Sequence, residues 1–188
     1  NQPFLIPKKS VFNKIIGDNA FELEFAAALE SRFADVVSYA KNTMGEGGIN
    51  FKIEYQAEDG NIREYYPDFF VKTTPKSFFI AETKGREDLD DIRKIRRLVT
   101  WCNDINTAQT DFTYSPVYVK QEVWEKTNKD LKSFSELLKV FSIDFDLFIT
   151  KAMSKEEAIK LLYKGVDVSN FGDPVQWQKE VRKDRKID

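Results

Sequence analysis

Large apolar residues recur at helical spacing near the start of the chain. Four of them lie three or four positions apart: Phe21, Phe25, Leu29 and Phe33. This spacing places them on one face of a helix. Because Asp18 or Asn19 can cap the first turn, the pattern predicts a helix over about residues 20–38. The preceding residues, 1–17, form a lead-in.

Alternation of apolar and polar residues takes over further along. It predicts a strand over residues 49–55, followed by a hairpin turn at Asp59-Gly60. A second strand is expected over about residues 62–72 and a third over residues 78–84. The turn residues 74–76 separate these two strands.

The rest of the chain favours helices. We expect a helix over residues 88–102 and a strand over residues 117–124. From about residue 128 the sequence is mostly helical, with a capping box at Ser154 and Glu157 and a proline after a cap at Asp173-Pro174. The order of elements predicts an α/β fold, with a core over residues 18–127 and a mostly helical C-terminal extension over residues 128–188. This extension either packs on the core or serves as a docking element.

Two acidic residues are placed to meet across the second and third strands. If these strands form an antiparallel hairpin centred on Pro75, Asp68 faces Glu82, and alternation puts Lys84 on the same face. Opposed Cβ atoms in such a pair lie ~4.5–5.5 Å apart. Carboxylates that close repel each other unless a cation lies between them. Oxygen ligands point to Mg²⁺, Mn²⁺ or Ca²⁺, and the carbonyl oxygen of Thr83 is a further candidate ligand.

Composition limits the chemistry further. The 188 residues include no histidine and one cysteine, Cys102. Ser-His-Asp and Cys-His triads, histidine-metal nucleases and cysteine zinc sites are therefore excluded. The net charge of −2 means that any contact with DNA is local. No stretch approaches the roughly 20 apolar residues of a membrane span. We expect a cytoplasmic domain of a larger protein, with no membrane partner.

The acidic residues resemble a known nuclease motif. Pro67-Asp68 followed by Glu82-Thr83-Lys84 resembles the PD-(D/E)XK signature. The wider series over residues 18–125 resembles the C-terminal endonuclease domain of type III restriction enzymes. Its members are Phe21-Glu22, Val36 to Asn42, Tyr65 to Phe69, Glu82 to Asp88 and Trp101-Cys102.

This resemblance implies a central mixed β-sheet flanked by helices and Mg²⁺-dependent cleavage of double-stranded DNA. It also implies a helicase-type ATPase domain in the same parent chain and a DNA methyltransferase subunit. Cleavage of both strands by one site per domain requires a second copy of the nuclease.

Each candidate site residue has an expected role. Asp68 and Glu82 hold the metal, and Lys84 orients or deprotonates the attacking water or neutralises charge on the phosphate. The resemblance also implies an acid on the first helix that acts near the metal, through water; Glu22 matches this position, with Glu24 as the alternative.

Basic residues are candidates for contact with DNA phosphates. Lys94 is the first of these, since the family often carries a lysine on this helix. The others are Arg93, Arg97, Lys41 and Arg86. A basic run on a helix is also typical of an ordinary solvated face.

Other interpretations stay open. Lys84 at a strand end can simply neutralise two surface acids by a salt bridge. The chain can also be a noncatalytic module that binds DNA or a partner with the nuclease fold, or a repair-type nuclease, because fold and motif do not choose the biological role.

Overall fold

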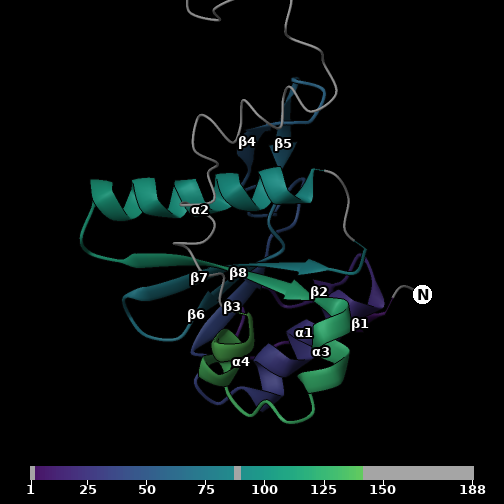
Figure 1. The fold of residues 1–188 in the computed structure, drawn as a ribbon. Helices are drawn as coiled ribbons and strands as arrows, with labels where there is room; N and C mark the ends of the chain where they lie inside the picture. Colours follow the sequence, from purple (N-terminus) through teal and green to yellow (C-terminus); the bar gives the residue numbers. More distant parts are fainter. Residues whose placement is uncertain (1–2, 87–89, 142–188) are drawn as a thin grey trace, which may run out of the picture. The chain divides into compact units, whose positions relative to one another are not determined.

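A computed structural model describes residues 3–86 and 90–141 (Figure 1). They belong to one compact unit of the chain, Asn1–Phe145. Glu87 and Asp88 of the motif series lie outside the described residues, as do the helix caps predicted at Ser154 and Asp173. Within the described part, no helix has both the length and the apolar character needed to cross a membrane.

A four-stranded mixed sheet forms the centre of this unit. Its strands are β3 (Ser38–Lys41), β6 (Phe69–Lys72), β7 (Ser77–Lys84) and β8 (Thr113–Lys120), in that spatial order. The first three pair antiparallel, whereas β7 and β8 are parallel and are connected through helix α2, Asp91–Ala108. The predicted α/β class with a mixed central sheet is confirmed.

Alternating residues send the sheet's apolar side chains to opposite faces. Phe69 and Val71 pack with α1 (Ala20–Ala27), α3 (Gln121–Thr127) and α4 (Phe134–Phe141). Ile80 packs on the other face with α2 and with the hairpin of β4 (Ile53–Gln56) and β5 (Ile62–Tyr65). Figure 1 shows α2 on one side of the sheet and the three shorter helices on the other. Helices therefore cover both faces, as expected for strands that are apolar on both sides.

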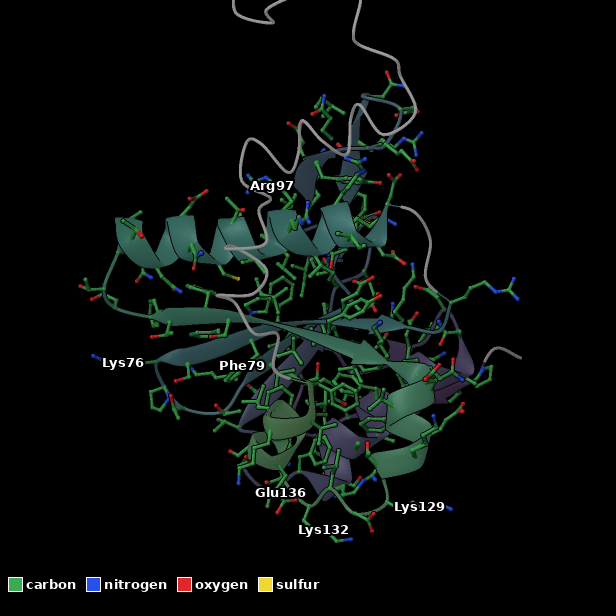
Figure 2. The ribbon with its side chains drawn as sticks, in the orientation of Figure 1. Lys76, Phe79, Arg97, Lys129, Lys132 and Glu136 are labelled. Carbon is green, nitrogen blue, oxygen red and sulfur yellow. The ribbon has the colours of Figure 1, made fainter. Side chains whose placement is uncertain are left out.

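Trp124 is the largest fully buried side chain of the core. Its ring lies 6.1 Å from Phe21, 5.6 Å from Phe25 and 6.4 Å from Phe33, measured between ring centroids. The apolar stripe predicted for the first helix therefore does face the core. On the same face of the sheet, Phe79 reaches from β7 towards α4 (Figure 2).

The first helix is shorter than predicted. α1 continues as a π-helical turn over Ala28–Arg32 and then stops, because Phe33 is extended with φ −86° and ψ 98°. Ser38, predicted as the last residue of the helix, is instead the first residue of β3. The β-branched pair Val36-Val37 precedes this strand, which is consistent with an extended chain.

The strand predicted over residues 62–72 is two strands in different sheets. It divides at Pro67, which has no amide hydrogen to donate to a ladder: β5 ends at Tyr65 and β6 begins at Phe69. The predicted hairpin turn at Asp59-Gly60 does join β4 and β5, with Gly60 at φ 84°.

Three other predicted boundaries are wrong. The strand expected over residues 49–55 begins only at Ile53, after Asn50 takes a left-handed conformation with φ 56°. The helix predicted to end at residue 102 continues to Ala108. The strand predicted over residues 117–124 is β8 to Lys120 and then helix α3.

Residues on both sides of the predicted core also enter its packing. In the lead-in, β1 (Phe4–Leu5) pairs with β2 (Ile15–Ile16), and Ile15 of β2 belongs to the same buried cluster as α1. So do Leu131 and three residues of α4: Phe134, Leu137 and Phe141. The first part of the predicted C-terminal extension therefore packs on the core.

Candidate active site

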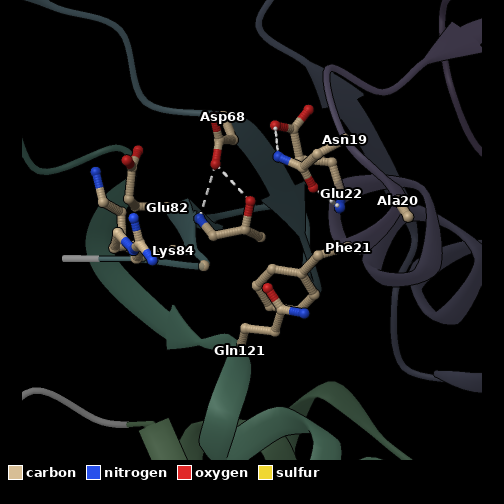
Figure 3. A pocket seen from close by; sticks show the side chains of 11 residues that line it. Asn19, Ala20, Phe21, Glu22, Asp68, Glu82, Lys84 and Gln121 are labelled. Carbon is tan, nitrogen blue, oxygen red and sulfur yellow. Dashed lines mark hydrogen bonds between the residues drawn. The ribbon is translucent and has the colours of Figure 1, made fainter.

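A cleft of about 580 Å³ opens where α1 begins and β7 ends. The four residues predicted to be catalytic, Glu22, Asp68, Glu82 and Lys84, all line it, together with Arg86. Figure 3 shows Asp68 between Glu82 on one side and Glu22 on the other. Residues far apart in the sequence thus share one solvent-accessible hollow.

The β6–β7 hairpin brings the central acids together. Its register pairs Phe69 with Ala81 and Phe70 with Ile80, which confirms the pairing predicted from the turn at Pro75. Asp68 immediately precedes β6, and Glu82 immediately follows Ala81, the last residue of β7 that pairs with β6. Both acids therefore lie at the same end of the hairpin.

Asp68 is fixed through one of its two carboxylate oxygens. The Thr83 amide and hydroxyl both donate to Oδ2, at 2.8 and 2.6 Å (Figure 3). Burial raises the pKa of the Asp68 carboxyl to about 6, although both Thr83 hydrogen bonds act in the opposite direction. The negative charge of Glu22 adds to the rise. The site therefore holds this carboxylate in place while disfavouring its charge.

Glu82 is held by a tyrosine from the other sheet. The Tyr65 hydroxyl donates to Glu82 Oε2 at 2.9 Å. Burial, and then the charge of Asp68, raise the pKa of Glu82 well above its usual range, against the effects of Tyr65, Lys84 and Lys94. Tyr65 belongs to the motif series but was given no role there. Its position two residues before Pro67 is the only sequence signal for it.

Lys84 forms its ion pair with a different acid. Its Nζ lies 2.8 Å from Oδ1 of Asp91, the first residue of α2. Among the described residues, neither Asp68 nor Glu82 has an ion-pair partner. The alternative in which Lys84 neutralises these two acids by a salt bridge is therefore contradicted. Asp91 falls within the helix predicted over residues 88–102, and its ion pair with Lys84 was not predicted.

The structure separates the two candidate acids of α1. Glu22 is buried at the cleft: its Oε1 accepts from the side chain of Asn19 at 2.7 Å, and its Oε2 lies 3.1 Å from Lys41 Nζ. Asn19 in turn caps the amide of Glu22, and the Asp18 amide donates to Glu22 Oε2 at 3.0 Å. Glu24 points away and accepts from the Trp124 indole at 3.0 Å.

Lys41 lies inside the molecule rather than at a DNA-facing surface. Its side chain is 3% exposed and pairs with Asp18 at 2.9 Å as well as with Glu22. Burial alone would lower the pKa of Lys41, but the hydrogen bonds to Asp18 and Glu22 raise it. The predicted phosphate contact is at odds with this burial, because strand β3 directs the ammonium towards α1.

The other basic candidates divide into two groups. Arg97 packs between α2 and the β4–β5 hairpin, where its Nε donates to the Glu54 carbonyl at 3.1 Å (Figure 2). Arg86 and Arg93 are exposed, and Arg86 lines the cleft. Lys94 is partly exposed, with its Nζ 3.4 Å from Asp91. The exposed arginines and Lys94 retain access to solvent.

The donor set at the cleft offers two carboxylates to a cation. Within the described residues, no group of three or more acidic or cysteine side chains is arranged to hold a metal ion. Both Glu22 oxygens are engaged, but Asp68 Oδ1 and Glu82 Oε1 accept no hydrogen bond from the described part of the chain. Two hard oxygen donors fit Mg²⁺, which typically takes one or two carboxylates and keeps several waters.

The sequence and fold were compared with those of known proteins. No protein-family model matches the chain, and neither curated proteins nor solved structures give a match.

Proposed function

We propose that this chain is a Mg²⁺-dependent endonuclease domain of the PD-(D/E)XK type that hydrolyses phosphodiester bonds of double-stranded DNA. One observation carries the proposal. Asp68 and Glu82 are two largely buried carboxylates that have no ion-pair partner among the described residues, and they face a cleft that also contains Lys84.

Physical chemistry supports a cation at this position. Burying two neighbouring charges without a counter-ion is costly, which is why the pKa of each carboxyl is raised. When bound, Mg²⁺ supplies a Lewis acid for a phosphodiester oxygen and lowers the pKa of its water. That the carbonyl oxygen of Thr83 is a third ligand of this cation stays a prediction.

The chain's own residues orient and bind. Thr83 binds one carboxylate oxygen of Asp68, and Tyr65 binds one carboxylate oxygen of Glu82. These hydrogen bonds fix both side chains and so orient the second oxygen of each acid. Lys84 brings a positive charge to the cleft. Because its ammonium is paired with a carboxylate, we assign it the task of orienting or neutralising phosphate oxygens. Arg86 at the rim is suited to a flanking phosphate.

The proposal extends to the parent protein through the resemblance to type III restriction enzymes. We infer that a helicase-type domain and a methyltransferase subunit present the DNA, since the net charge of −2 gives this chain little attraction of its own for a duplex. A second nuclease copy would cut the second strand.

Plasmid cleavage with matched variants tests the proposal. The chain is incubated with supercoiled plasmid in Mg²⁺, Mn²⁺, Ca²⁺ or EDTA, beside Glu82→Gln, Lys84→Ala and Lys76→Ala. Lys76 is an exposed lysine at the far end of the same hairpin (Figure 2). We expect nicking with Mg²⁺ or Mn²⁺ that falls at least ~100-fold in the first two variants and is unchanged in Lys76→Ala.

Two results would overturn the proposal. Cleavage that persists in Glu82→Gln would mean that these acids are not the site. If nothing is cut, calorimetry with Mn²⁺ on the same samples decides. Binding lost in Glu82→Gln would support an intact site that requires its partner domains, whereas no binding would favour a noncatalytic module with the same fold.

A further inference from the structure

Two neighbouring aspartates at the start of α2 bind different parts of the molecule. Asp90 faces the β4–β5 hairpin, where its Oδ2 lies 3.1 Å from Arg63 Nη1. Asp91 faces the cleft side, where its Oδ1 lies 2.8 Å from Lys84 Nζ and 3.4 Å from Lys94 Nζ. Oδ1 of Asp91 thus forms ion pairs with two ammonium groups, one from β7 and one from α2.

Burial makes this contact more than a surface ion pair. The Asp91 side chain is 6% exposed, whereas those of Lys84 and Lys94 are 18% and 21% exposed. A carboxylate buried to this degree requires its partners, because an unpaired charge there is costly. Exposed ion pairs, by contrast, contribute little. The position of Lys84 is therefore coupled to that of Asp91.

The acids next to Lys84 give this coupling a consequence. Lys84 lines the same cleft as Glu82 and lies only two positions from it on the same face of β7, and its charge already acts on the Glu82 carboxyl. A lysine released from Asp91 would share the cleft with Asp68 and Glu82, two acids that have no ion-pair partner among the described residues. An ammonium bound there would occupy the place of the cation.

We propose that Asp91 is a positioning residue that holds the Lys84 ammonium away from the Asp68–Glu82 pair, so that this pair stays open to a divalent cation while Lys84 faces the phosphate. The inference rests on the proposed function. It assigns no contact between Asp91 and the substrate: Asp91 acts through Lys84, and Lys94 shares its carboxylate.

A double-mutant cycle tests this assignment. Mn²⁺ affinity is measured by calorimetry, and the nicking rate with the plasmid, for Asp91→Asn, Lys84→Ala and the double variant. We expect Asp91→Asn to weaken Mn²⁺ binding and nicking roughly 10- to 100-fold. In the Lys84→Ala background the same substitution should leave Mn²⁺ affinity unchanged, because the Lys84 ammonium, through which Asp91 acts, is then absent.

Asp90→Asn is the matched control, since it removes the neighbouring carboxylate from the hairpin side. It should lower thermal stability without changing Mn²⁺ affinity. Asp91→Glu, which keeps the charge, should recover part of the Mn²⁺ affinity. If Asp91→Asn weakens Mn²⁺ binding equally with and without Lys84, Asp91 does not act through this lysine and the inference is overturned.

A spectroscopic measurement separates this inference from the proposed function. If the wild-type protein binds no Mn²⁺ and cuts no DNA, the proposed function fails, and the lysine side-chain nitrogen resonances decide the remaining point. A shift of the Lys84 resonance in Asp91→Asn, but not in Asp90→Asn, would support the positioning contact. An unchanged Lys84 resonance would overturn it.

Discussion

Replacing Asp68 by asparagine should stabilise the protein at neutral pH. Both Thr83 donors bind the same oxygen, Oδ2, so the amide oxygen of an asparagine can accept both hydrogen bonds. The substitution removes the negative charge while keeping the shape. We therefore expect a gain in folding stability together with the loss of cation binding.

The size of this gain follows from the raised pKa. Folding moves the pKa of the Asp68 carboxyl from 3.8 to about 6, so the folded state binds a proton more tightly than the unfolded chain. Stability therefore falls as the pH rises from 4 to 6, and the full penalty is present above pH 6. It amounts to about 3 kcal/mol at pH 7.5 and to less than ~1 kcal/mol at pH 4.

Urea denaturation in EDTA measures the effect at the two pH values. Asp68→Asn should be more stable than the wild type by about 1–3 kcal/mol at pH 7.5 and nearly equal at pH 4. Mn²⁺ at 100 times its dissociation constant should return about 2.7 kcal/mol to the wild type at pH 7.5 and nothing to the variant.

Asp35→Asn provides a control of opposite sign. Asp35 uses both oxygens to accept from the first turn of α4, at Phe134 and Ser135. Burial raises the pKa of the Asp35 carboxyl, but these hydrogen bonds outweigh burial and hold the pKa below its usual value. An asparagine has only one acceptor oxygen and cannot accept all of these hydrogen bonds. The free energy of unfolding of the variant should therefore fall by about 1 kcal/mol at pH 7.5. The reasoning is refuted if Asp68→Asn is no more stable than the wild type at pH 7.5, or if its advantage does not change with pH.

Three further substitutions test the parts around the cleft. Tyr65→Phe removes the hydroxyl that donates to Glu82, and calorimetry should show Mn²⁺ binding about 10- to 100-fold weaker. Tyr55→Phe, in the same hairpin, is the control and should bind Mn²⁺ as the wild type does. Trp124→Ala should lower the free energy of unfolding in urea by about 3–5 kcal/mol, and a loss below ~1 kcal/mol would show that the helices do not pack around this ring. Lys41→Met should cost about 3 kcal/mol because it leaves Glu22 buried without its cation, and adding Glu22→Gln should recover at least half of that loss.

The sequence predicted those features that depend on neighbouring residues. The pairing of Phe70 with Ile80 follows from a short turn and period-two alternation. The inward face of α1 follows from apolar spacing, and the start of α1 from the cap at Asn19. The division of one predicted strand at Pro67 had a signal as well, because a proline rarely stands inside a central strand.

Features that depend on distant partners were not predictable in this way. β3 has four residues, and its register is set by β6, about thirty positions later. Nothing near Lys41 marks it as buried, since its partner Asp18 is 23 residues away. An aspartate at a helix start is common for reasons of helix charge alone, so Asp91 carried no sign of its lysine partners.

The hairpin register also limits which changes of length the chain can accept. An insertion of one residue inside β6, or inside the part of β7 that pairs with it, would turn either Asp68 or Glu82 to the opposite face of the sheet. The protein would keep its fold and lose its acid pair. An insertion in the turn at residues 73–76 would lengthen the loop and leave the pair intact. In diverging sequences, the number of residues between the two acids, thirteen here, is therefore free to vary, provided that the variation falls in the turn.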